Sequence, residues 1–176
     1  MEIQELSLEG AKLITPQVFR DGRGFFLESY REDRYQDFEK SFTQDNHSYS
    51  KQGVIRGMHF QSEPGQAKLV RVAIGKIYDV IVDIRPKSPT FGKWCGVTLD
   101  DASHQQLFIP VGFAHGFCVL SQEAHVLYKT STPFCASTEQ GFRFDDPDVG
   151  IKWPVSKPLL SDRDRNASSF HEMELL

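Results

Sequence analysis

Apolar residues recur at every second position in short runs along the chain, and polar turns separate these runs. The clearest run spans residues 77–85, whose even-numbered members form an apolar face. Its other face carries Asp79 and Asp83, which would face solvent on an open sheet or the lumen of a closed barrel. Further runs of this type span 94–99, 105–109, 116–120 and 125–130. Many short strands with few helical segments and no internal repeat predict an all-β sandwich or barrel.

The N-terminal part contains a strong hairpin signal. Asp21-Gly22 lies between the apolar pairs Val18-Phe19 and Phe25-Phe26, and such a dipeptide between apolar runs favours a tight turn. Arg23 would then lie at the tip, where an arginine usually carries only solvated charge. Shorter apolar runs at 3–8 and 11–14 precede the hairpin.

The hairpin is followed by an aromatic stripe. Tyr35, Phe38 and Phe42 have helical spacing, which predicts one short helix over residues 32–42. The next polar stretch, from residue 44 onward, suits a loop or a ragged edge strand.

Two strands and their connection, at 53–61 and 68–72, bring Arg56, His59 and Lys68 within thirteen residues. Strict alternation places Arg56 and His59 on opposite faces of the first strand. For both side chains to share a pocket, the alternation has to break between them. Gly57 is the position where a bulge has the lowest steric cost. We therefore expect a bulge there and interpret these strands as the floor of a site.

Composition indicates an ordinary globular protein that forms one domain over residues 1–176. Hydrophobic residues make up 39% of the chain and charged residues 25%. The net charge of −4 argues against nucleic acid and membrane surfaces as partners. The three cysteines, Cys95, Cys118 and Cys135, have no metal-type spacing and predict reduced thiols. With no apparent signal peptide, the expected location is the cytoplasm.

Two histidine-containing stretches resemble the signature motifs of the cupin jelly-roll barrel. They are Gly53 followed by His59, and the turn Pro110–His115. A metal-binding cupin has a second histidine two residues after the first, where this chain has Gln61. Two histidines make a poor site for zinc, iron or manganese, so we expect no metal. A metal-dependent cupin enzyme remains an alternative that stoichiometric metal would support.

Without a metal, the same residues suit proton abstraction next to a carbonyl group. His59 is the natural base, because imidazole titrates near neutrality, and Tyr128 is the natural acid on the opposite side. Nearby cations would stabilise the developing enolate oxygen. A lone histidine is more often a hydrogen-bonded core residue, and a strand tyrosine is more often packing. A cluster of cations around one barrel mouth makes that interpretation less attractive.

Motifs along nearly the whole chain match those of one known family in the same order. The matching segments are Asp21–Phe26, Gln44–Asn46, Val54–Gln61, Ala67–Arg71, Asp79–Arg85, Ser88–Gly92, Ile109–Phe117, Leu127–Thr130 and Leu160–Asp164. Together they resemble the dTDP-4-dehydrorhamnose 3,5-epimerase family. The resemblance implies epimerisation at C3 and C5 of dTDP-4-dehydro-6-deoxy-D-glucose, without a cofactor. The alternatives are a single C3 epimerase of a related nucleotide-sugar pathway and a non-catalytic cupin that binds nucleotide sugars.

The resemblance also assigns roles to single residues. His59 is the proton acceptor, Tyr128 the proton donor and Asp164 the dyad partner of His59, with Asp162 and Asp83 as weaker candidates for that partner. Lys68 assists catalysis and binds substrate. The other implied substrate-binding positions are Arg23, Glu28, Gln44, Asp45, Asn46, Arg56, His115, Phe134, Glu139 and Arg163.

The resemblance further implies a homodimer in which an exchanged N-terminal strand brings Arg23 and Glu28 into the neighbouring site. Two positions depart from the family's pattern. Phe134 stands where tyrosine is common, which keeps a stacking face and loses a hydroxyl. Arg163 stands where lysine is frequent, and it still supplies a cation.

Overall fold

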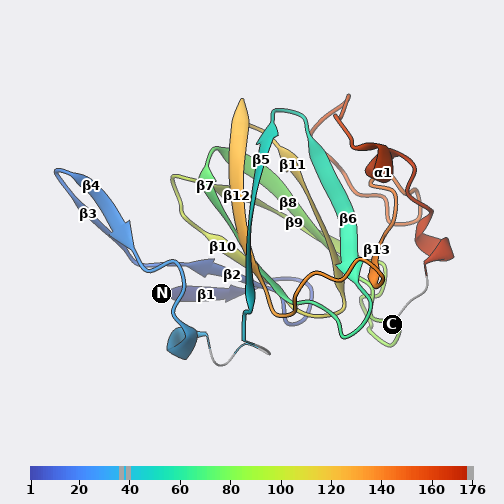
Figure 1. The fold of residues 1–176 in the computed structure, drawn as a ribbon, viewed down its shortest axis with the longest axis horizontal. Coiled ribbons are helices and arrows are strands. Elements are labelled where there is room, and N and C mark those ends of the chain that lie inside the picture. The colour runs from blue at the N-terminus through green and yellow to red at the C-terminus, as the bar shows by residue number, and fades with distance from the viewer. Residues whose placement is uncertain (36–37, 39–40, 174–176) are drawn as a thin grey trace.

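The computed structural model describes residues 1–35, 38 and 41–173, and its architecture is two facing antiparallel β-sheets (Figure 1). One sheet has six strands in the order β1 (Glu2–Glu5), β2 (Lys12–Thr15), β10 (Gln106–Ile109), β7 (Lys68–Ile74), β12 (Glu123–Thr130) and β5 (Gln44–Lys51). The other has five, in the order β13 (Glu139–Gly141), β6 (Ile55–Gln61), β11 (Phe113–Val119), β8 (Lys76–Asp83) and β9 (Trp94–Asp100). This arrangement confirms the predicted all-β sandwich of the jelly-roll type.

The main core lies between the two sheets. Val70 and Val126 from the six-stranded sheet pack against Ile81 and Phe117 from the five-stranded one. A second apolar cluster covers the outer face of the five-stranded sheet, where the C-terminal segment adds Phe170. The even-numbered residues 80, 82 and 84 belong to this second cluster, and 77 and 81 to the first. The alternation in 77–85 therefore reflects a strand that is buried on both faces.

The predicted hairpin is present and stands apart from the sheets. Strands β3 (Val18–Asp21) and β4 (Gly24–Leu27) pair only with each other and project from the body of the molecule (Figure 1). Their aromatic residues Phe19, Phe25 and Phe26 are all exposed. An isolated two-stranded ribbon with exposed aromatic rings is poorly stabilised by its own chain.

The predicted helix over 32–42 is only partly present. The structure has a 3-10 helix, η1 (Glu32–Arg34), while residues 36–37 and 39–40 lie outside the described part of the chain. Tyr35 and Phe38 are buried, and Phe38 stacks on Phe108 of β10 with 4.6 Å between ring centroids. The aromatic stripe therefore packs on the outer face of the six-stranded sheet, as its apolar character predicts.

The C-terminal part contains a capped helix and a strand that alternation had not predicted. Ser161 caps α1 (Asp162–Arg165), because its hydroxyl accepts a hydrogen bond from the backbone N–H of Asp164. A second 3-10 helix, η2 (Phe170–Glu172), follows. Strand β13 is only three residues long and pairs with β6 alone, so it leaves no alternation in the sequence. None of the helices in the described residues is long and apolar enough to cross a membrane.

The expected irregularity in β6 is confirmed. His59 pairs with His115 of β11, whereas Arg56 pairs with Phe117, so β6 has one more residue than β11 between these pairs. Gly57 has φ of 129°, a conformation that other residues rarely adopt. A Cβ atom there would lie 2.5 Å from the Cα of Gly116. The bulge at Gly57 therefore turns Arg56 and His59 toward the same cavity.

Candidate active site

A cavity of about 340 Å³ lies between the two sheets. The six-stranded sheet contributes Lys68 and Tyr128, and the five-stranded sheet contributes His59 and His115. The bulge also brings Arg56 to the cavity wall. His59 and Tyr128 therefore line the same space from facing sheets, which is the geometry that an acid and a base on opposite sides of a ligand require.

His59 forms a dyad with Asp164. Its Nε2 lies 2.6 Å from Oδ1 of Asp164, which is buried on α1. Because a carboxylate only accepts hydrogen bonds, Nε2 carries the proton and Nδ1 keeps its lone pair. Burial raises the pKa of the Asp164 carboxyl, but His59, together with hydrogen bonds from Ser161 and the Gly57 backbone, outweighs this effect and the pKa is lowered. The dyad thus holds His59 in one tautomer, with a nitrogen ready to accept a proton.

Tyr128 is suited to donate a proton. Burial raises the pKa of its phenol, Glu139 raises it further, and Arg56 opposes both effects. The phenol therefore stays protonated at neutral pH. The backbone of Tyr128 pairs with Val70 on one side and Asn46 on the other, so this residue lies on an inner strand of the sheet. A rigid inner strand fixes the position of the phenol relative to the cavity.

Two further basic groups lie deep in the cavity. Lys68 is buried and has no ion pair within the described residues, and burial lowers its pKa to about 8, against the charges of Glu139 and Asp79. His115 is also buried, and its Nε2 lies 2.9 Å from Oδ1 of Asp79. Burial lowers the pKa of His115, Asp79 opposes this effect, and Lys68 and His59 add to it. Buried cations without full compensation favour an anionic or electron-rich ligand.

The mouth of the cavity carries the more exposed predicted residues. Gln44 and Asn46 hydrogen-bond to each other at 2.9 Å, and the side-chain oxygen of Gln44 accepts the backbone N–H of Phe134 at 3.0 Å. The ring of Phe134 is exposed at this edge. Arg163 donates to Glu139 at 2.6 Å and links α1 to β13. This rim presents hydrogen-bonding groups, charges and one open aromatic face.

Three predicted substrate-binding residues do not line the cavity of their own chain. Asp45 alternates with Gln44 and Asn46 on β5, so its carboxylate points to the outer face and accepts a hydrogen bond from Lys129 at 2.7 Å. Arg23 lies at the hairpin tip with 91% of its side chain exposed, and it pairs with Asp21. Glu28 pairs with two arginines near the base of the hairpin, Arg31 and Arg34.

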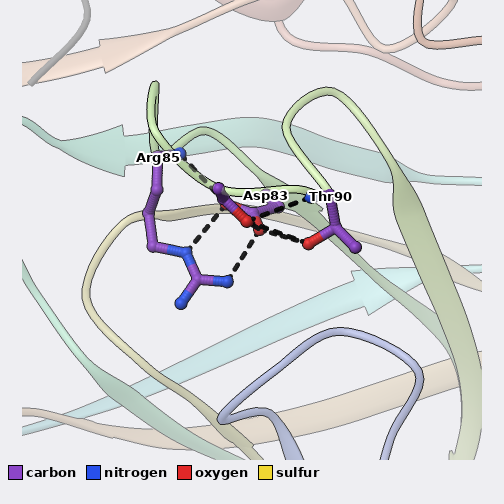
Figure 2. A network of polar contacts seen from close by, with 4 residues as sticks. Asp83, Arg85 and Thr90 are labelled. Carbon is purple, nitrogen blue, oxygen red and sulfur yellow. Dashed lines mark hydrogen bonds and ion pairs between the residues drawn. The ribbon is translucent and has the colours of Figure 1, made fainter.

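The two weaker candidates for the dyad partner also lie elsewhere. Asp83 is fully buried and binds Arg85, Ser88 and Thr90, all between 2.6 and 2.9 Å (Figure 2). Asp162 does not line the cavity. Asp164 is therefore the dyad partner, because it contacts His59 whereas Asp83 and Asp162 lie elsewhere.

Four lining residues had not been predicted as site residues: Ser48, Gln66, Phe117 and Ser161. Ser48 follows Gln44 and Asn46 at period two, so alternation along β5 would have identified it. Gln66 and Ser161 lie outside the strands, where no periodic signal exists. Gln61, at the second metal-ligand position of cupins, is engaged differently. Its amide donates to the backbone oxygen of Pro133 at 3.2 Å and accepts the N–H of Cys135 at 3.3 Å.

The charge of Lys68 predicts a pH dependence. A lysine with a pKa of about 8 is charged below that pH and neutral above it. A reaction that needs this cation is therefore expected to slow as pH rises through about 8. The measurement is kcat/KM against pH for the wild type and for Lys68→Gln, which should be slow and lack this alkaline limb. An unchanged limb in Lys68→Gln would assign it to another group.

Known proteins similar to this chain point to one family. A family model described as dTDP-4-dehydrorhamnose 3,5-epimerase matches residues 5–172. A protein of that name from Neisseria gonorrhoeae is 48% identical over 99% of this chain, which spans 54% of that protein. Another from Shigella flexneri is 47% identical over 97% of this chain and 96% of its own length. A dTDP-4-dehydrorhamnose 3-epimerase from Streptomyces niveus is 42% identical over 95% of this chain and 83% of its own length.

Solved structures agree with this pattern. The crystal structure of dTDP-6-deoxy-D-glucose-3,5-epimerase from Legionella pneumophila, in complex with dTDP-4-keto-L-rhamnose, superimposes with a TM-score of 0.95. Its sequence is 41% identical, and the match covers 98% of this chain and 94% of that one.

Proposed function

Because the chain belongs to the dTDP-4-dehydrorhamnose 3,5-epimerase family, we propose that it inverts C3 and C5 of dTDP-4-dehydro-6-deoxy-D-glucose. The product is dTDP-4-dehydro-L-rhamnose, and the enzyme is an isomerase. One observation carries the mechanism: His59 and Tyr128 line one cavity from facing sheets. Both carbons flank the C4 ketone, so their protons become acidic when the resulting enolate is stabilised.

Each inversion is one proton removed and one proton returned on the opposite face. Nδ1 of His59 takes the proton from C3 or C5, and the electron pair moves into an enolate with the charge on the C4 oxygen. Tyr128 then donates its phenolic proton to the other face of the same carbon. His59 afterwards loses the acquired proton to solvent and Tyr128 regains one. The same two side chains serve both carbons in turn.

Lys68 and His115 supply the electrostatic part of this proposal. Both lie deep in the cavity and present nitrogen atoms to an enolate oxygen. Charge stabilisation in a buried site is strong, because little water competes with it. At the rim, Arg56, Gln44, Asn46, Glu139 and Arg163 hold the nucleotide and the sugar, and Phe134 stacks on the base.

Asp164→Asn is expected to lower kcat by about 10- to 100-fold while KM changes little, because the dyad prepares the base and does not hold the nucleotide. Steady-state kinetics measure both constants. Asp146→Asn is the matched control, since Asp146 is another buried carboxylate and accepts backbone N–H groups away from the cavity. An unchanged kcat in Asp164→Asn would remove Asp164 from the mechanism.

We further propose that the protein acts as a homodimer with exchanged N-terminal segments. Support comes from the hairpin, which projects from its own chain with exposed aromatic residues (Figure 1). Arg23 and Glu28 belong to this segment and do not line the cavity of their own chain. In a two-fold dimer each hairpin reaches the partner's cavity, where these two residues bind substrate.

Subunit mixing tests this exchange. Arg23→Ala and His59→Ala are each expected to be weakly active or inactive alone, whereas a mixed dimer has one site with an intact His59 and an intact Arg23. A 1:1 mixture that exchanges freely should therefore recover about a quarter of the wild-type activity, since half of the dimers are mixed and half of their sites are complete. No recovery, with mixed dimers demonstrated by mass spectrometry, would show that Arg23 serves its own chain.

The second candidate function is inversion at C3 alone, because a 3-epimerase is also among the similar proteins. Product analysis by NMR separates the two. Incubation with dTDP-4-dehydro-6-deoxy-D-glucose is expected to give dTDP-4-dehydro-L-rhamnose. A product inverted only at C3 would support the second candidate, and unchanged substrate that still binds would indicate a binding protein.

A further inference from the structure

Asp79 is a buried carboxylate behind the cavity with incomplete hydrogen bonding. It lies on β8, is fully buried and accepts one hydrogen bond, from Nε2 of His115 at 2.9 Å. Its second oxygen, Oδ2, is buried and has no partner within the described residues. Burying an incompletely satisfied carboxylate is unfavourable, so packing alone does not explain this residue.

A second buried aspartate on the same strand, Asp83, has the full set of partners expected of a carboxylate with a purely structural role. Asp83 lies four residues further along β8 and on the same face. It is equally buried, but the guanidinium of Arg85 and the hydroxyls of Ser88 and Thr90 bind its two oxygens (Figure 2). Asp79 instead has a titratable ring as its partner, and its charge acts on Lys68.

We propose that Asp79 is a positioning residue that holds His115 with its proton on Nε2 and supplies the negative charge that keeps Lys68 protonated. Since a carboxylate accepts the Nε2 proton, Nδ1 is the His115 nitrogen left for a ligand. A nearby anion also favours a second proton on that ring, which makes Nδ1 a donor when an enolate oxygen develops. Asp79 thus acts through two neighbours and touches no substrate. The proposal deepens the proposed epimerase function and rests on it for the catalytic consequence.

The charged groups around Lys68 and His115 determine how the pKa values of these two residues should respond when Asp79 is removed. Lys68 is influenced by Glu139 of β13 and by Asp79, and it lies close enough to His115 to lower the pKa of that ring. His59 acts on His115 in the same direction. Glu139 is paired with Arg163, which compensates part of its charge. Asp79 is therefore the negative charge behind Lys68, which has to be a cation, and behind His115, whose Nε2 proton it holds.

The test compares Asp79→Asn with Asp83→Asn, which removes an equally buried charge from the same strand. Asp79→Asn is expected to lower kcat by about 10- to 100-fold, less than the loss of a whole oxyanion-stabilising donor, with KM changed by less than about threefold. The alkaline limb of kcat/KM should move to lower pH by about one unit, because removing a nearby anion lowers the pKa of a lysine. Asp83→Asn should leave the limb in place. The proposal fails if Asp79→Asn keeps the wild-type kcat and the wild-type alkaline decrease of kcat/KM. It also fails if both variants shift that decrease by the same amount in pH.

Two spectroscopic measurements need no turnover. Nitrogen-15 NMR of the wild type, with His115 assigned through His115→Gln, should show the His115 proton on Nε2, and a proton on Nδ1 alone would overturn the proposal even if Asp79→Asn does not fold. Carbon-13 NMR of the Lys68 side chain should show a lower titration midpoint in Asp79→Asn, and an unchanged midpoint would contradict the proposal. If the wild type fails to epimerise while both signals behave as expected, the proposed function fails and the role of Asp79 stands.

Discussion

His59→Ala is expected to abolish epimerisation and to leave nucleotide-sugar binding largely intact. The variant removes the ring that Asp164 orients, and a positioned general base contributes about 10²- to 10⁴-fold to such reactions. Because this base serves both carbons, both inversions should be slowed by a factor in that range. Binding should change little, since the rim residues that are proposed to hold the nucleotide are untouched. Product formation by NMR and dTDP binding by calorimetry measure the two effects separately.

His171→Ala is the matched control for this variant. His171 also forms a histidine–aspartate pair, with Asp148 at 3.1 Å, but its side chain is 74% exposed and does not line the cavity. The activity of the His171→Ala variant should equal that of the wild type. If His59→Ala kept more than a tenth of the wild-type rate while remaining folded, another group would be the base.

Tyr128→Phe is expected to uncouple proton exchange from inversion. The variant keeps the ring and loses the phenolic proton, so inversion should fall by about 10²- to 10³-fold. His59 still removes the proton from C3 and returns one to the same face. In deuterated water the recovered substrate should therefore gain deuterium at C3 much faster than epimer is formed. This split identifies Tyr128 as the donor, because loss of the base would suppress both processes.

Tyr78→Phe controls for the loss of a strand hydroxyl. Tyr78 lies on β8 and packs against Trp153 on the outer face of the five-stranded sheet, away from the cavity. Its variant should invert the sugar at the wild-type rate. Equal losses of exchange and inversion in Tyr128→Phe would instead indicate a damaged site.

The predictions from the sequence held where a residue's neighbours along the chain determine its position. Period-two alternation located most strands, and Gly57 was identified because two side chains could share a pocket only if β6 was irregular there. The same rule would have placed Asp45 on the outer face, but the stretch from residue 44 onward was interpreted as a loop or a ragged edge strand. It is the edge strand β5, and its pairing with β12 is regular. Treating that segment as a strand would also have added Ser48 to the site.

Other features depend on contacts between distant segments, which no local pattern encodes. His59 and Asp164 are 105 residues apart, and only the resemblance to a family paired them before the structure brought them to 2.6 Å. Strand β13 exists because backbone groups of residues 139–141 pair with β6, so it needs no alternation. The buried state of Asp79 was equally ambiguous, since an acidic residue on a strand usually faces solvent.

The most direct test of the account is to run the wild-type reaction in deuterated water and locate deuterium in the product by NMR and mass spectrometry. A base that releases its proton to solvent and a separate acid that refills from solvent place one deuteron at C3 and one at C5. The expected product is dTDP-4-dehydro-L-rhamnose that is two mass units heavier, with both positions labelled. An inverted product that retains its original hydrogen at either carbon would contradict it.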